Sequence, residues 1–158
     1  MAWVDDLARR YTGHRLPPHS AEVERGRLRF FAKTIGETDP VYLDDEAARD
    51  AGHRSLPVPP TFLFCLDMDM PEPYAYLDEM GIELGRVLHG EQSFRYHRMA
   101  YADDRLSFQS RISDIYTKKE GALLFMLRDT AVHNQGGELV AELQSLVVIR
   151  NDVPGGAA

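Results

Sequence analysis

Cysteine is almost absent from this sequence, and its scarcity excludes an internal disulfide. The one cysteine, Cys65, lies in an apolar run, so we expect a small buried hydrophobic residue in a reducing compartment. No apolar stretch is long enough to cross a bilayer, and the first residues do not follow the signal-peptide pattern. These absences favour a cytoplasmic protein that does not act at a membrane.

Positive charge is also in short supply. Lys and Arg number 18 against 25 Asp and Glu, which gives a net charge of −7. Nucleic-acid binding depends on clustered Lys and Arg, so this composition argues against it. The composition does not exclude a small anionic ligand, which needs only a local basic patch. The candidate members of such a patch are Arg54, Arg98, Arg111, Lys118 and Lys119.

Several common functional motifs are missing. The sequence has no Gly-rich phosphate loop, no dinucleotide fingerprint and no Gly-x-Ser-x-Gly nucleophile elbow. The histidines at positions 14, 19, 53 and 133 show no metal-ligand spacing, and no group of Cys and His predicts zinc. We therefore expect neither a metal nor a bound cofactor.

The most distinctive stretch is the polar turn at residues 36–42, here called the acidic bend. A helix over 25–35 is predicted before it, because apolar residues recur there at helical spacing: Leu28, Phe31, Ala32 and Ile35. Gly36 suits the end of that helix, and Pro40 prevents its continuation. The bend gathers two carboxylates, Glu37 and Asp39, and the phenol of Tyr42. Loops on a rigid scaffold often carry chemistry, although Glu37 and Asp39 are also common turn residues and Tyr42 could simply fill space.

The rest of the N-terminal half predicts short elements. We expect a helix over 3–11, a strand over 19–23, and a helix that Asp44 caps and Gly52 ends. Three prolines then lead into the apolar run 61–66, which is predicted as a buried helix, with a buried strand as the alternative. Residues 67–80 are expected to form a flexible, partly apolar excursion.

The C-terminal half alternates apolar and polar residues, which predicts strands. The four runs cover approximately 88–96, 106–112, 124–132 and 139–149, and turn sequences at 102–104, 118–121 and 134–137 separate them. We expect an antiparallel meander. The run containing Leu123, Phe125 and Leu127 is apolar on both faces, so it is predicted to be central.

Helices followed by a meander indicate an α+β domain. We expect one domain over residues 1–152, with a disordered tail at 153–158. The predicted architecture is a hot dog fold, in which an antiparallel sheet of about five strands wraps around one buried helix. Such sheets commonly pair with a second copy, so a dimer is expected.

Several ordered blocks resemble the MaoC-like dehydratase family, in particular its N-terminal-half subgroup. The resemblance runs from about Val4 to Ile149, and its blocks are Phe31–Tyr42, Ala47–Gly52, Pro59-Pro60-Thr61-Phe62 and Leu88–Arg98. It implies a hot dog fold and the addition or removal of water across the double bond of an enoyl-CoA thioester. CoA is then part of the substrate.

Catalytic members of that family carry a Gly-Asp-x-Asn-Pro-x-His block, and this chain departs from it. Gly36 and Pro40 are kept, but Glu37 replaces the Asp, Asp39 the Asn and Tyr42 the His. A phenol with an ordinary pKa of about 10 is a poor base at neutral pH. If any imidazole replaces the missing base, His89 is the candidate, although a lone histidine can also be structural.

The resemblance thus gives candidate catalytic residues Glu37, Tyr42 and His89, and candidate substrate-binding residues Asp39, Pro60, Thr61, Phe62 and Arg98. In the N-terminal-half subgroup such a domain often serves as the acyl-binding half beside a catalytic half. By that analogy, the partner would be a second MaoC-like subunit in a heterodimer, with a homodimer as the alternative.

Four functions compete at this point. The chain could be a divergent hydratase or dehydratase acting alone, or a non-catalytic acyl-binding subunit. It could also be a hot dog thioesterase in which Glu37 activates water, or a binding and assembly module without turnover. Loss of both family residues, at Glu37 and Tyr42, favours the acyl-binding subunit.

Overall fold

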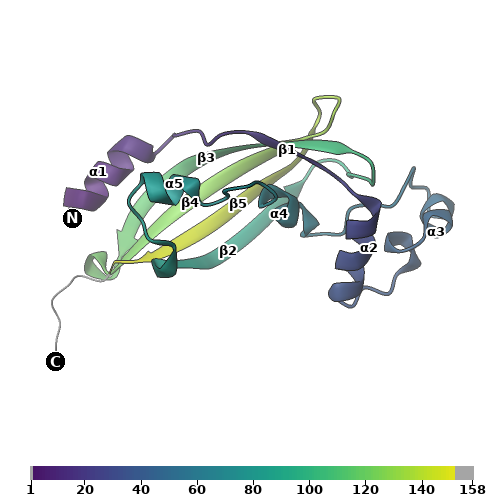
Figure 1. The fold of residues 1–158 in the computed structure, drawn as a ribbon, viewed down its shortest axis with the longest axis horizontal. Helices are drawn as coiled ribbons and strands as arrows, with labels where there is room; N and C mark the ends of the chain where they lie inside the picture. The colour runs from purple at the N-terminus through teal and green to yellow at the C-terminus, as the bar shows by residue number, and fades with distance from the viewer. Residues whose placement is uncertain (1, 152–158) are drawn as a thin grey trace.

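The computed structural model describes residues 2–151, so the predicted tail at 153–158 lies outside the described residues. Five strands form one antiparallel sheet in the order β1-β3-β4-β5-β2 (Figure 1). The strands are β1 (His19–Glu22), β2 (Val87–Tyr96), β3 (Arg105–Lys118), β4 (Leu123–His133) and β5 (Leu139–Arg150). The α-helices are α1 (Ala2–Tyr11), α2 (Arg25–Thr34), α3 (Asp45–Asp50), α4 (Phe62–Asp67) and α5 (Ala75–Glu79). Short 3₁₀ turns are η1 (Pro40–Tyr42), η2 (Leu84–Arg86) and η3 (Lys119–Gly121).

Strand β4 is central, as predicted, but the simple four-strand meander is wrong. β3, β4 and β5 follow one another as neighbours, whereas β2 pairs with β5 on the far edge, from Val87 opposite Ile149 to Tyr96 opposite Ala141. The connection at 97–104 therefore crosses from β2, at one edge of the sheet, to β3, which lies next to β1 at the other edge. Its buried Ala100 and Ala102 hydrogen-bond to the chain at Val58 and Leu56. Alternation identifies strands but does not say which strands pair.

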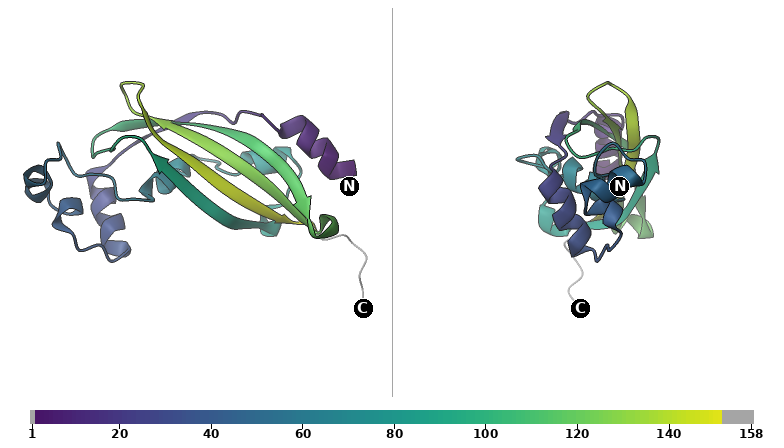
Figure 2. Two further views of the ribbon diagram at one scale, coloured as in Figure 1. Left: turned by 180° about the vertical axis from the view of Figure 1, so that it is seen from behind. Right: turned by 90° about the vertical axis from the view of Figure 1, so that its right-hand side faces the viewer.

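Helix α4 confirms the helical interpretation of the apolar run and lies on the inner face of the sheet. Figures 1 and 2 show α1, α4 and α5 on one face, with α2 and α3 beyond one end of the sheet. Leu63 and Leu66 of α4 are almost fully buried. Burial along β4 alternates strictly, so that Leu124, Met126 and Val132 face the helices. Two core clusters result, one around α4 and one beneath α1 and α5.

Residues 67–80 are more ordered than the sequence suggested. Asp67 ends α4, and α5 follows with Leu77 buried. Leu77, Met80 and Ile82 pack in one cluster with Val4 and Leu7 of α1. This packing holds the segment against the sheet, because each buried aliphatic side chain removes apolar area from water. No helix within residues 2–151 is long and apolar enough to cross a membrane.

Candidate functional site

An apolar crevice lies on the inner face of the sheet, between β2, β5 and the segment that joins α4 to η2. Its volume is about 140 Å³. Apolar and aromatic side chains dominate the lining, and the polar groups are few. The lining residues are Phe64, Met68, Pro73, Tyr74, Tyr76, Leu84, Val87, Leu88, His89, Arg128, Ser145 and Val147. This inner crevice has the composition of a site for an apolar ligand.

His89 lines the inner crevice because β2 contains a bulge. The register to β5 shifts between His89 and Glu91, so His89 pairs with Val147 on the inner face. Gly90 allows this close approach, since a Cβ there would lie 2.8 Å from Val148 Cγ2 and 3.2 Å from the Leu146 carbonyl oxygen. The His89 and Phe64 rings pack edge-to-face, with ring centroids 5.1 Å apart. His89 Nε2 lies 3.1 Å from the Glu91 carbonyl oxygen. No carboxylate is paired with His89 among residues 2–151.

The inner crevice also contains a charged residue that sequence reasoning missed. Arg128 is 5% exposed, and its Nη2 donates to Asp67 Oδ2 at 2.5 Å. Asp67 is 1% exposed; burial raises the pKa of this carboxyl despite the attraction of Arg128. The signal was present in the sequence. Arg128 shares the inward phase of Met126 and Thr130, and Asp67 stands one helical turn after Leu63.

A second, smaller cavity of about 60 Å³ lies on the other side of this ion pair. Its lining includes His14, His19, Asp67, Tyr76 and Arg128. His19 stacks on Phe108 with ring centroids 4.9 Å apart, and its Nε2 lies 3.0 Å from the Leu66 carbonyl oxygen. Pro73, Tyr76 and Arg128 line both cavities and therefore lie between them.

The structure brings the three predicted residues of the acidic bend together, but both carboxylates accept hydrogen bonds from backbone N–H groups of the bend itself. Glu37 Oε1 accepts the backbone N–H groups of Thr38 at 2.8 Å and Asp39 at 2.9 Å. Asp39 Oδ1 accepts the N–H of Val41 at 3.0 Å, which caps η1. Burial, together with the charges of Glu37 and Asp39, raises the pKa of Tyr42. The linings of the cavities described here include no residue of the bend.

The predicted binding residues at the start of α4 lie apart from the inner crevice as well. Thr61 has a left-handed backbone with φ of 73°, and its N–H donates to the Tyr96 hydroxyl at 3.0 Å. Phe62 is buried against Phe31, with ring centroids 5.0 Å apart. Pro60, just before this turn, is exposed. Sequence reasoning did not single out Tyr96, because its partner is distant in sequence.

Arg98 lies on the surface, where it forms an exposed ion pair with Glu138 at 3.2 Å. Such pairs contribute little to stability, about 0–1 kcal/mol. Among the described residues, no group of three or more His, Cys, Asp or Glu side chains is arranged to hold a metal ion.

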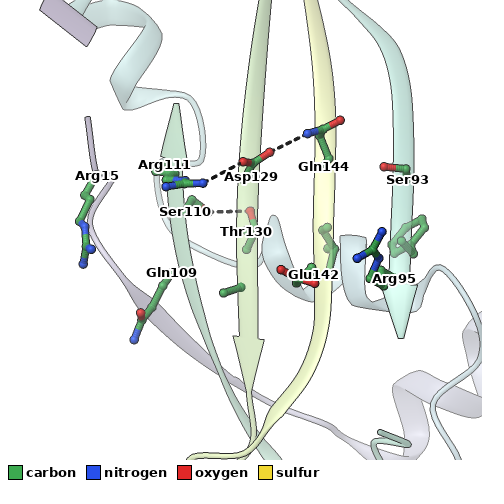
Figure 3. Close-up of a pocket in the computed structure, with 13 residues that line it drawn as sticks. Arg15, Ser93, Arg95, Gln109, Ser110, Arg111, Asp129, Thr130, Glu142 and Gln144 are labelled. Atoms are coloured by element: carbon green, nitrogen blue, oxygen red, sulfur yellow. Dashed lines mark hydrogen bonds and ion pairs between the residues drawn. The ribbon is translucent and has the colours of Figure 1, made fainter. Parts of the chain in front are cut away.

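A wider, open hollow of about 590 Å³ lies on the outer face of the sheet (Figure 3). Figure 3 shows Arg111, Asp129 and Gln144 side by side on β3, β4 and β5. Arg111 Nη2 lies 3.5 Å from Asp129 Oδ2, and the Gln144 amide donates to Asp129 Oδ1 at 2.8 Å. These polar groups satisfy one another and include neither His nor Cys, so the inner crevice is the better candidate site.

Residues 10–143 match the family described as FAS1-like, dehydratase domain region. The chain belongs to this MaoC-like dehydratase family. A UPF0336 protein of Streptomyces griseus is 35% identical over 145 residues, covering 91% of this chain and 95% of that protein. The predicted family membership is confirmed.

Solved structures of MaoC-like proteins share the fold. The HadBC (3R-hydroxyacyl-ACP dehydratase) complex from Mycobacterium tuberculosis matches with a TM-score of 0.70 and 26% identity, over 85% of this chain and 92% of the other. A MaoC-like dehydratase matches with a TM-score of 0.80 and 22% identity, over 92% of this chain but 44% of the other. These likenesses confirm the α+β hot dog fold.

Proposed function

We propose that this MaoC-like protein is the acyl-binding subunit of an enoyl thioester hydratase or dehydratase. In this proposal a second hot dog subunit supplies the catalytic Asp and His, and the inner crevice receives the acyl chain. The observation that carries the proposal is that the carboxylate at the family's Asp position and the backbone N–H at the start of α4 already have hydrogen-bond partners inside this chain.

The first engaged group is the carboxylate of Glu37, at the position of the family's Asp. Its Oε1 accepts two backbone N–H groups of its own loop. Tyr42, at the position of the family's His, is a weak base whose pKa is raised further by burial and nearby carboxylates. Neither group is set up to activate water at neutral pH.

The second engaged group is the backbone N–H of Thr61. In catalytic relatives an N–H at the start of the buried helix is expected to bind the thioester oxygen, where it stabilises the enolate. Here that N–H donates to Tyr96 at 3.0 Å. Both the acid–base step and the oxyanion contact are therefore assigned to the partner.

The partner is assigned to the edge of the sheet formed by β2. This strand is outermost in the order, and large apolar residues are exposed on and near it, namely Leu88 at 53%, Tyr96 at 48% and Met99 at 50%. An unpaired edge with exposed apolar groups favours pairing with another sheet. HadBC, a structural relative, is a complex, and the MaoC-like dehydratase match spans under half of that longer chain.

The test combines the purified protein with a MaoC-like subunit that carries the Gly-Asp-x-Asn-Pro-x-His block. Crotonyl-CoA is added to each protein alone and to the mixture, and loss of the enoyl thioester absorbance is followed. We expect a stable complex whose turnover exceeds that of either protein alone. Turnover by the isolated chain, abolished by Glu37→Gln or His89→Ala, would overturn the proposal. Release of free thiol would instead identify a thioesterase.

A further inference from the structure

The inner crevice has an exposed end and a buried end. Its exposed lining residues are Tyr74, Leu84 and Leu88, and Leu88 pairs with Val148 near the end of β5. Its most buried lining residues are Arg128 and Ser145, which pair with each other across β4 and β5. An acyl chain that enters beside the exposed residues and runs inward would therefore meet the side chain of Arg128.

A second hollow lies beyond Arg128. The smaller cavity shares Pro73, Tyr76 and Arg128 with the inner crevice, and its lining also includes Ser110 of β3. The inner crevice is lined by β2 and β5 instead. Because β4 lies between β3 and β5 in the sheet, Arg128 stands at the boundary between two hollows on either side of its strand.

An ion pair fixes this boundary. Arg128 Nη2 donates to Asp67 Oδ2 at 2.5 Å, and both side chains are almost fully buried. Arg128 Nε and Asp67 Oδ1 are enclosed by the surrounding atoms. To advance past this pair, an apolar chain would have to separate the two groups, which would leave a buried charge without its partner. An uncharged side chain could move aside without that cost.

The volume in front of the pair limits the length of chain that fits. The inner crevice measures about 140 Å³. An apolar cavity of about 150 Å³ in another protein accommodates benzene, so the inner crevice has room for about six carbon atoms. The smaller cavity would add about 60 Å³ if the boundary were removed.

We propose that the Arg128–Asp67 pair is the end wall of the inner crevice and restricts it to short-chain acyl thioesters, with acyl groups of up to about six carbons. This inference rests on the proposed function, because it assumes that the inner crevice receives the acyl chain. It adds a limit on chain length, and a pair of residues that sets this limit, which neither the fold nor the relatives specify.

The test measures binding of butanoyl-, hexanoyl-, octanoyl- and decanoyl-CoA by calorimetry, to the full chain alone and in the reconstituted complex. We expect affinity to rise about fourfold for each methylene up to hexanoyl-CoA, the gain from burying one CH₂, and then to stop rising. If affinity rises at this rate up to decanoyl-CoA, the inference fails and the proposed function stands. If no acyl-CoA binds, or if all four bind equally, both fail.

A double variant tests whether the ion pair is the end wall. Asp67→Leu with Arg128→Ala removes both charges together and shortens the side chain between the two hollows. We expect affinity to go on rising to octanoyl-CoA or beyond, while butanoyl-CoA binding changes less than about twofold. A rise that still stops at hexanoyl-CoA in the folded variant would overturn the inference.

Two further variants keep the test decisive. Asp129→Leu with Arg111→Ala removes an ion pair on the outer face, and the rise should still stop at hexanoyl-CoA. If the inner variant does not fold, Asp67→Leu with Arg128→Met preserves the packing better, and its flexible, uncharged methionine can move aside. Octanoyl-CoA should then bind more tightly than hexanoyl-CoA, and equal binding would contradict the inference. The series on the unchanged protein needs no variant and can refute the inference by itself.

Discussion

The Tyr96 hydroxyl accepts the backbone N–H of Thr61 at 3.0 Å, and so joins the edge strand β2 to the first turn of the central helix. Thr61 reaches this contact with a left-handed backbone, φ 73°, which is unfavourable for a β-branched residue. This hydrogen bond thus ties β2 to the start of α4.

The left-handed turn gives a prediction for Thr61. Glycine lacks the Cβ that makes this conformation costly. The free energy of unfolding of Thr61→Gly should therefore be about 1 kcal/mol higher than that of Thr61→Ala. Urea denaturation of both variants measures the difference. An alanine variant as stable as the glycine variant would mean that the backbone relaxes away from this conformation.

Asp104 should make folding depend on pH in the acid range. Burial raises the pKa of this carboxyl, but hydrogen bonds from Arg54, Gln135 and the Tyr101 N–H outweigh it, so the pKa lies below its usual value. A depressed pKa means that the folded state binds the proton less tightly than the unfolded state. The stabilisation is therefore present above about pH 4, the unfolded pKa, and is lost as pH falls through the folded pKa.

Asp104→Asn tests this dependence. We expect it to lower the free energy of unfolding at pH 7 by about 1–3 kcal/mol, and the difference from the wild type should shrink as the pH falls below about 4. Asp103→Asn is the matched control, since Asp103 is an exposed neighbour, and it should change stability by less than about 0.5 kcal/mol. A difference that grows with acid would contradict the assignment.

Two variants of Glu37 distinguish a structural role of this carboxylate from a catalytic one. Glu37→Gln keeps an oxygen for the N–H groups of Thr38 and Asp39, whereas Glu37→Ala removes it and should cost about 1 kcal/mol of stability. Turnover by the reconstituted complex should stay within about twofold for Glu37→Gln. A fall of about a hundredfold, the effect typical of a lost general base, would indicate catalysis by this chain.

Gly90 is predicted to be intolerant of a side chain. The Cβ of alanine would meet Val148 at 2.8 Å, so Gly90→Ala should push β2 away from β5 and cost about 1–3 kcal/mol. Gly85→Ala has open space around the new Cβ and serves as the neutral control. Thermal unfolding compares the two variants. Equal melting temperatures would show that the bulge does not depend on this glycine.

Much of the fold followed from local patterns. Helical spacing gave α2, the apolar run gave α4 and alternation gave the strands, because the period of burial directly reflects backbone geometry. The acidic bend was also predicted as a tight turn, and its residues do lie together. Two readings of its carboxylates were left open, contact with a ligand and ordinary turn chemistry. The structure gives them backbone N–H partners one and two positions further along the chain, as the turn reading predicts.

The sequence by itself determined the fold class, the family and the departure from the catalytic block, since each depends on residues close together along the chain. Only the tertiary structure decided that β2 lies beside β5 and that Arg128 meets Asp67, 61 positions away. The physical reason is that a buried charge needs a partner but does not specify it. Which partner it meets depends on the spatial order of the strands in the sheet and on where α4 packs against them.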